Sequence, residues 1–158
     1  MHEFTIGQRT YRTCRMNAFK QLHVARRILP VFAKLPEMVG MSLEEIMKDT
    51  KGVVKNLMEN LDVIKLDVIA GTLSMLKDED INYVLNACCE SVEIKEAQGI
   101  GWARVMRDGA LMYQHVGPQE MIAFLVHVIK DNLSGFFSGN ALTSGQGEAI
   151  REPIPTTL

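Results

Sequence analysis

Alternating apolar and polar positions predict two β-hairpins far apart in the chain. The first spans Phe4–Arg12 and turns at Gly7-Gln8, because a leading glycine suits a type II′ turn. The second pairs residues 102–106 with residues 110–116 and turns at Asp108-Gly109, a dipeptide that tolerates the positive φ angles of a type I′ turn. These two hairpins are expected to supply the strands of a small sheet.

Apolar residues at helical spacing follow the first hairpin. Asn17 is expected to cap a helix over residues 17–35. Pro30 is expected to kink or restart that helix, and Pro36 to end it. The positions assigned to its buried face are Phe19, Leu22, Ala25, Ile28, Leu29 and Phe32.

Further helices are predicted in the middle of the chain. Ser42–Glu45 forms a capping-box pattern, and Gly52 is expected to interrupt the short helix that starts there. The apolar stripe over Val53–Leu76 predicts one long helix or two pieces broken at Gly71. The next helix has acids at its N-terminus, and its expected buried face comprises Ile81, Val84, Leu85 and Cys88. A brief strand is expected over residues 92–94.

One more helix closes the pattern. Pro118 suits a first helical position and opens a helix over Gln119–Phe137, which Gly135 or Gly139 is expected to end. Its buried face is assigned to Met121, Phe124, Leu125, Val128, Ile129 and Leu133. Residues 138–158 lack an apolar period and are expected to form a flexible tail. The predicted fold is mainly α (α+β): one helical domain over residues 1–137, with a small antiparallel sheet made from the two hairpins.

Charge is unevenly distributed along the chain. The net charge is −2, yet residues 1–36 carry seven basic residues against one acid, and residues 37–100 carry six against thirteen. A basic head and an acidic middle can pair within the fold, steer a partner, or meet across subunits of a homo-oligomer. The last alternative predicts self-association that weakens as salt rises.

The residue types that usually carry catalysis or bind metal are too scattered to form a recognisable site. No two histidines have the H-x-x-x-H spacing of a zinc site. The cysteines are odd in number, which favours a reducing compartment, and two of them lie inside a predicted helix rather than at its N-terminus. We therefore expect no enzyme, no cofactor and no metal. Neither a signal peptide nor an apolar run long enough to span a membrane is expected.

One basic cluster offers an alternative function. Its members are Arg12, Arg15, Lys20, Arg26, Arg27 and Lys34. On the outside of a helix these side chains could contact phosphate groups, as in a small nucleic-acid-binding phage or bacterial regulator. The acidic pI of about 6.1 and the lack of helix-turn-helix spacing disfavour that alternative.

Several stretches together resemble a known family. Phe4-Thr-Ile-Gly, Tyr11-Arg12 and the run from Asn17 to Arg27 with Pro30 resemble the opening of the tail assembly chaperones of long-tailed bacteriophages. In the second half, Trp102, Gly109-x-Leu-Met-Tyr113 and Asn132-Leu-x-x-Phe-Phe137 are similar to the pattern that closes that domain. The resemblance covers roughly residues 3–137 and rests on structural motifs.

This resemblance implies a non-enzymatic protein of the host cell cytoplasm. It would bind the tape-measure protein, shield the apolar helices of that protein from aggregation, and recruit tail-tube subunits. We expect partner contacts on the exposed side of helix 17–35 and at the end of the last helix, through Lys20, His23, Arg26, Arg27, Phe136 and Phe137. The alternatives are that the arginines are merely solvated and that the two phenylalanines close the core.

Overall fold

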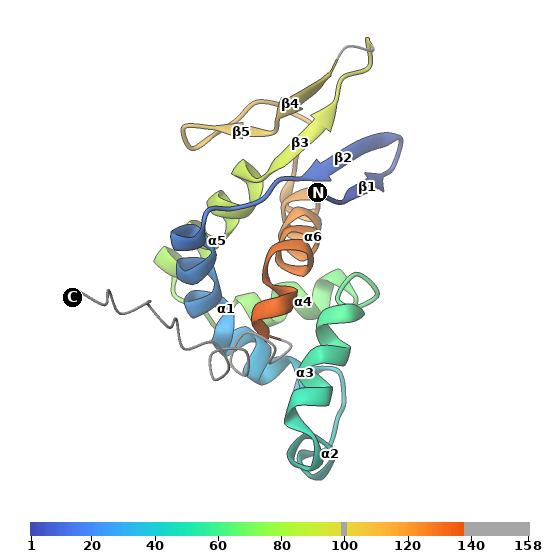
Figure 1. Ribbon diagram of the computed structural model, residues 1–158, viewed down its shortest axis with the longest axis vertical. Helices are drawn as coiled ribbons and strands as arrows, with labels where there is room; N and C mark the ends of the chain where they lie inside the picture. Colours follow the sequence, from blue (N-terminus) through green and yellow to red (C-terminus); the bar gives the residue numbers. More distant parts are fainter. Residues whose placement is uncertain (99–100, 138–158) are drawn as a thin grey trace, which may run out of the picture.

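The computed structural model describes residues 1–98 and 101–137, apart from the side chains of residues 54, 58, 136 and 137 (Figure 1). The sheet stands at one end of the molecule, and the helices extend away from it. This arrangement is the predicted helical fold with a small antiparallel sheet. The predicted tail, residues 138–158, lies outside the described residues.

The main sheet has four antiparallel strands in the order β1-β2-β3-β4. They are β1 (Glu3–Ile6), β2 (Arg9–Thr13), β3 (Val92–Lys95) and β4 (Trp102–Arg104). The first predicted hairpin is β1-β2. Gly7 has a φ of 60° and Gln8 has no positive φ, as a type II′ turn requires. Strand β3 confirms the brief strand predicted at residues 92–94.

The second hairpin turns where predicted, but its arms differ from the prediction. Asp108 and Gly109 have φ angles of 49° and 76°. They join β5 (Met106–Arg107) to β6 (Ala110–Leu111) in a separate two-stranded sheet. The first arm is divided at Val105, which is buried. The Val105 amide donates a hydrogen bond to the Val92 carbonyl at 3.0 Å, and the Val105 carbonyl accepts one from the Met112 amide at 2.9 Å. Strand β6 ends at Leu111, so residues 112–116, which were predicted to continue the second arm, are not part of a strand.

Helix α1 (Ala18–Met38) starts where predicted and ends later. The Asn17 side chain accepts a hydrogen bond from the Lys20 amide at 2.8 Å, which confirms the cap. The expectation that Pro30 would restart the helix and Pro36 end it is wrong, because the helix is continuous through both. The second half of α1 carries buried residues, Pro36 among them, and this packing outweighs a cost of about 3 kcal/mol for an interior proline.

The buried face of α1 also differs from the prediction. Ala25, Ile28 and Phe32 are buried as expected. Phe19, Leu22 and Leu29 were assigned to the core, yet their exposed fractions are 79%, 54% and 54%. The buried positions of this helix are Val24, Ala25, Ile28, Val31, Phe32, Leu35 and Pro36. They form a face rotated away from the predicted one.

Three short helices follow, α2 (Leu43–Lys48), α3 (Thr50–Glu59) and α4 (Leu66–Leu73). The Ser42–Glu45 capping box is present. The break expected at Gly52 lies instead at Asp49, whose carboxylate accepts from the Gly52 amide at 2.9 Å and caps α3. A Cβ at Gly52 would lie 2.0 Å from that carboxylate, so glycine leaves room for the cap. The predicted long helix is broken at residues 60–65, and Gly71 lies inside α4.

The last two helices follow the predicted pattern closely. Helix α5 (Asp78–Glu90) begins with three acids and buries Val84 and Cys88, whereas Ile81 and Leu85 are only half-buried. Helix α6 (Pro118–Phe137) opens at Pro118, and Gly135 does not end it. All the assigned core positions of α6 are buried except Met121, which is half-buried. None of the helices in the described ranges is both long and apolar enough to cross a membrane.

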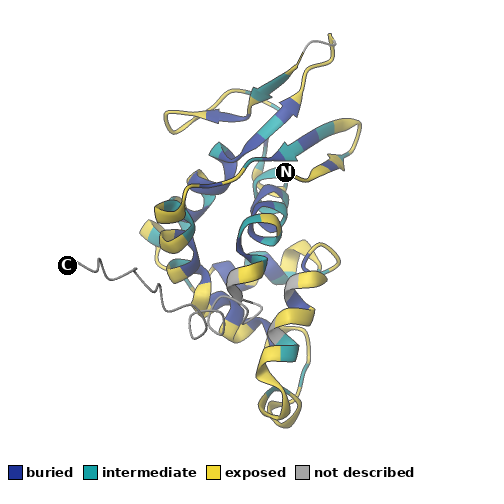
Figure 2. Ribbon diagram, in the orientation of Figure 1, coloured by how far each residue is buried: buried dark blue, intermediate teal, exposed yellow. Residues whose placement is uncertain are grey.

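Helix α6 lies at the centre of the molecule. It contacts β2 and the helices α1, α3, α4 and α5. Phe124 packs against Phe4 and Tyr11, with ring centroids 6.2 and 5.0 Å away, and so joins the helix to the sheet. The buried residues concentrate on the surfaces that face α6 (Figure 2).

Candidate partner-binding surfaces

One face of α1 presents large apolar side chains to solvent. We call Phe19, Leu22, His23, Arg26 and Leu29 the α1 stripe. Steps of three and four residues place them on one side of the helix, opposite the core. All five are exposed, and Phe19 is 79% exposed. Three large apolar side chains aligned on one helix face are typical of a protein interaction site rather than of isolated surface residues.

Two of the predicted contact residues, Lys20 and Arg27, turn toward α5 instead. The Lys20 ammonium lies 2.7 Å from Glu90, and Arg27 Nε lies 3.1 Å from Asp80 Oδ1. The Arg27 guanidinium also stacks over a tyrosine ring of α5 at 4.0 Å. The basic head and the acidic middle thus pair within the fold at these positions.

His23 and Arg26 remain on the outer side. The His23 ring meets the Tyr83 ring edge-on, with centroids 6.1 Å apart. Arg26 is exposed and has no ion pair with any residue that the structure describes. Of the predicted contact residues, these two belong to the α1 stripe. Phe136 and Phe137 form the end of α6, and their side chains lie outside the described part.

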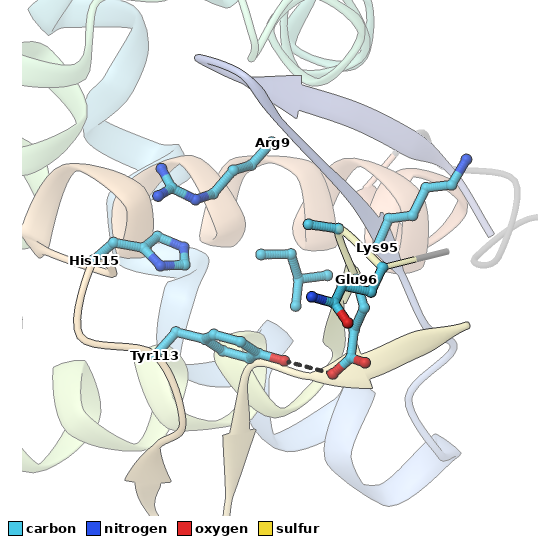
Figure 3. Close-up of a pocket in the computed structure, with 8 residues that line it drawn as sticks. Arg9, Lys95, Glu96, Tyr113 and His115 are labelled. Atoms are coloured by element: carbon cyan, nitrogen blue, oxygen red, sulfur yellow. Dashed lines mark hydrogen bonds between the residues drawn. The ribbon is translucent and has the colours of Figure 1, made fainter. Parts of the chain in front are cut away.

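A pocket of about 450 Å³ opens beside the sheet (Figure 3). Its lining comes from the start of β2, from β3 and the residues after it, and from the segment before α6: Arg9, Ile94, Lys95, Glu96, Ala97, Gln98, Tyr113 and His115. We call it the Arg9 pocket. It lies on the side of the sheet that carries Tyr11 and Ile94 toward the helices.

Hydrogen bonds fix the two rings that form one wall of the Arg9 pocket. Tyr113 Oη donates to Glu96 Oε1 at 3.4 Å, and His115 Nε2 lies 3.0 Å from the buried Tyr11 hydroxyl. Burial lowers the pKa of His115, and the nearby Arg9 lowers it further. Burial and Glu96 raise the pKa of Tyr113. Both rings are therefore neutral at physiological pH.

The buried thiols lack the features of nucleophiles. Burial raises the pKa of Cys88 far above its ordinary value and that of Cys89 to about 12. Cys88 and Cys89 are therefore protonated at physiological pH and unsuited to nucleophilic attack. In the part of the chain that the structure describes, His, Cys, Asp and Glu side chains form no group of three that could hold a metal ion.

Sequence reasoning predicted contacts on the exposed side of helix 17–35, including His23 and Arg26, but it assigned the apolar members of the α1 stripe to the core. It did not predict the Arg9 pocket. The apolar residues of α1 lie on two faces of the helix, the buried face and the α1 stripe. Assigning each apolar residue of the sequence to one of two helix faces could have separated them. The Arg9 pocket combines residues about 85 to 105 positions apart, and no local pattern marks them. The pairing of β2 with β3 and the hydrogen bond between Tyr11 and His115 bring its walls together.

Comparison with known proteins supports the resemblance found in the sequence. Searches of curated proteins and of solved structures give no match. A family model described as "phage tail assembly chaperone protein, TAC" matches residues 7–143. The match begins at the turn of the first hairpin and extends past the end of α6, so it includes every helix of the described part and every strand there except β1. The chain therefore belongs to the phage tail assembly chaperone family.

Proposed function

We propose that this protein is a non-enzymatic chaperone that binds the tape-measure protein in the host cell cytoplasm and recruits tail-tube subunits. Membership of the family supports a role in tail assembly. The structural observation that supports binding most directly is the α1 stripe, because it leaves three large apolar side chains without a cover in the described molecule.

The α1 stripe suits an amphipathic helix of the tape-measure protein. Such a helix would lay its apolar face on Phe19, Leu22 and Leu29, as in helix-in-groove recognition. Arg26, between the apolar residues, would attract acidic residues at the margin of that helix. Burial of the surface that these three side chains still expose contributes about 3–6 kcal/mol, and association costs about 4–15 kcal/mol. One helix would thus be held weakly and could be released when the tail is completed.

The other predicted contact residues have a different place in this proposal. Lys20 and Arg27 would lie at the rim, because their charges are already paired with acids of α5. Phe136 and Phe137, at the end of α6, would extend the contact area. Because rim charges change association rates more than affinity, substitution of Lys20 or Arg27 should affect binding less than substitution of the apolar stripe residues.

Co-expression with the tape-measure protein tests the proposal. The wild-type chain should co-purify with the tape-measure protein and increase its soluble fraction. The double variant Phe19→Gln/Leu29→Gln should lose about 90% of that effect, since both side chains lie in the proposed contact. Met47→Gln is the matched control, because Met47 is 77% exposed on α2 and outside the α1 stripe.

Two outcomes would contradict different parts of the proposal. If the wild-type chain neither co-purifies with the tape-measure protein nor increases its solubility, chaperone binding is wrong. If the wild type binds and the double variant binds equally well, the α1 stripe is not the contact. Circular dichroism should show unchanged melting for both variants, because the substituted side chains are exposed.

Recruitment of tail-tube subunits is the second step of the proposal. Tail-tube protein added to the preformed complex should co-elute with it in size-exclusion chromatography. Elution of the tube protein alone would contradict recruitment without affecting tape-measure binding. A homo-oligomer also remains a prediction, and sedimentation at low and high salt would test it.

The structure gives little support to a nucleic-acid-binding regulator. Arg12, Lys20 and Arg27 each lie within 3.1 Å of a carboxylate oxygen, so a phosphate would have to compete with these acids. This alternative requires a salt-dependent mobility shift that Arg26→Ala/Arg27→Ala abolishes.

A further inference from the structure

The Arg9 pocket has the dimensions of a small-ligand site. Its volume of about 450 Å³ lies within the usual range of about 300–1,000 Å³ and could hold two amino-acid residues. Ile94, only 6% exposed, contributes an apolar side chain to the lining. The pocket thus combines an apolar base with a wall of two neutral rings.

Arg9 supplies positive charge to the pocket. Its guanidinium lies beside the His115 ring, whereas the Lys95 side chain extends outward (Figure 3). Arg9 has no ion pair within the described residues. The charges of Arg9 and Glu120 of α6 also interact, but the two side chains form no ion pair, and the Glu120 carboxylate accepts from the Gly117 amide at 2.9 Å. Arg9 is therefore available to a ligand.

Glu96 restricts the kind of anion that the pocket accepts. Its carboxylate accepts the hydrogen bond from the Tyr113 hydroxyl at the edge of the pocket (Figure 3) and would repel a dianion such as phosphate more strongly than a single carboxylate. The planar guanidinium of Arg9 matches a carboxylate in a bidentate pair. The ligand should then carry one carboxylate next to an apolar group.

We propose that the Arg9 pocket binds the free carboxyl end of a partner polypeptide. The α-carboxylate would pair with Arg9, and an apolar last side chain would pack on Ile94 and the Tyr113 ring. The space that remains accommodates the preceding residue. This site is separate from the α1 stripe, so the full chain could hold a helix and a chain end at the same time.

Isothermal titration calorimetry on the full chain tests the proposal with a hexapeptide that ends in leucine. Amidation of its carboxyl end should weaken binding by about tenfold or more, because a charge-assisted hydrogen bond is lost. Arg9→Gln should weaken binding to a similar extent. Arg15→Gln, the same change at an exposed arginine outside the pocket, should leave the affinity within about twofold.

Two further arms make the result independent of folding defects and of ligand length. Glu96→Gln should strengthen binding by about two- to fivefold, because it removes a negative charge near the bound carboxylate. N-acetylleucine should bind at least about threefold more weakly than the hexapeptide, since it lacks the preceding residue.

Each of three results would overturn the proposal. Equal affinity for the free and amidated hexapeptides would show that the carboxylate is not recognised. Equal loss in Arg9→Gln and Arg15→Gln would indicate a general charge effect. Equal affinity for N-acetylleucine and the hexapeptide would reassign the pocket to small carboxylic acids.

Discussion

Asn132 is the residue whose replacement should reveal most about how the two ends of the domain hold together. From α6 its side chain accepts a hydrogen bond from the Met16 amide at 2.8 Å and donates one to the Cys14 carbonyl at 3.2 Å. These bonds fix the segment between β2 and α1 against the last helix. In Asn132→Ala, an amide and a carbonyl next to the core lose their partners.

The expected loss follows from those two groups. An unsatisfied buried backbone group costs about 1–3 kcal/mol, and the Cys14 carbonyl should cost less because Cys14 is only half-buried. Alanine recovers about 0.5 kcal/mol through its higher helix propensity. The free energy of unfolding should therefore fall by about 1–4 kcal/mol, a large part of the roughly 5–15 kcal/mol of a typical domain.

Urea denaturation followed by circular dichroism measures this change. With a slope of about 2 kcal/mol per molar urea, the midpoint should fall by about 0.5–2 M. Asn86→Ala is the matched control, since Asn86 is exposed on α5 and should shift the free energy by no more than about 0.5 kcal/mol. A loss below about 1 kcal/mol for Asn132→Ala would refute the reasoning, because water would then be satisfying both backbone groups.

Three other measurements probe separate features. Burial lowers the pKa of His127 below its ordinary value of 6.5, so the folded chain binds this proton less readily than the unfolded chain. The contribution of His127 to stability should therefore be complete above about pH 6.5 and fall as the pH drops below that value. In urea titrations at several pH values, His127→Phe should reduce this pH dependence. Ellman's reagent at pH 8 should modify Cys14 first and reach Cys88 and Cys89 only on unfolding, so rapid loss of three thiols would contradict their burial. Gly109→Ala should destabilise the chain by about 1–2 kcal/mol in thermal melts, because φ is 76° there, and an unchanged melting temperature would contradict this.

Local signals predicted the start of most elements correctly. Asn17, Ser42 and Pro118 each mark a helix N-terminus through a short-range bond or a fixed φ, and Asp108-Gly109 sets its own turn. These effects involve only neighbouring residues, so the local sequence is enough to predict them. Continuity of α1 through Pro30 depends instead on packing against distant helices, which propensity alone does not represent.

The candidate surfaces were harder to predict for a related reason. Phe19, Leu22 and Leu29 have the spacing of a buried face, but all three are exposed. Hydrophobicity alone does not distinguish an apolar side chain that packs in the core from one on the surface. Likewise, Lys20 and Arg27 looked like a free basic face because the acids that pair with them lie more than fifty residues away. The charge totals indicated that the basic head and the acidic middle could pair, but they did not indicate which residues form the ion pairs.

The contacts between the first strands and α6 affect how the chain folds during translation. Thr13 donates to Asp131 at 2.6 Å across 118 positions, and Phe4 needs Phe124 and His127 to cover its ring. Synthesis at about 5–20 residues per second separates the appearance of these partners by about 6–24 s. During that interval the apolar face of the first hairpin has no helix to cover it. A newly made chain should therefore itself be prone to aggregation until its last helix has been translated.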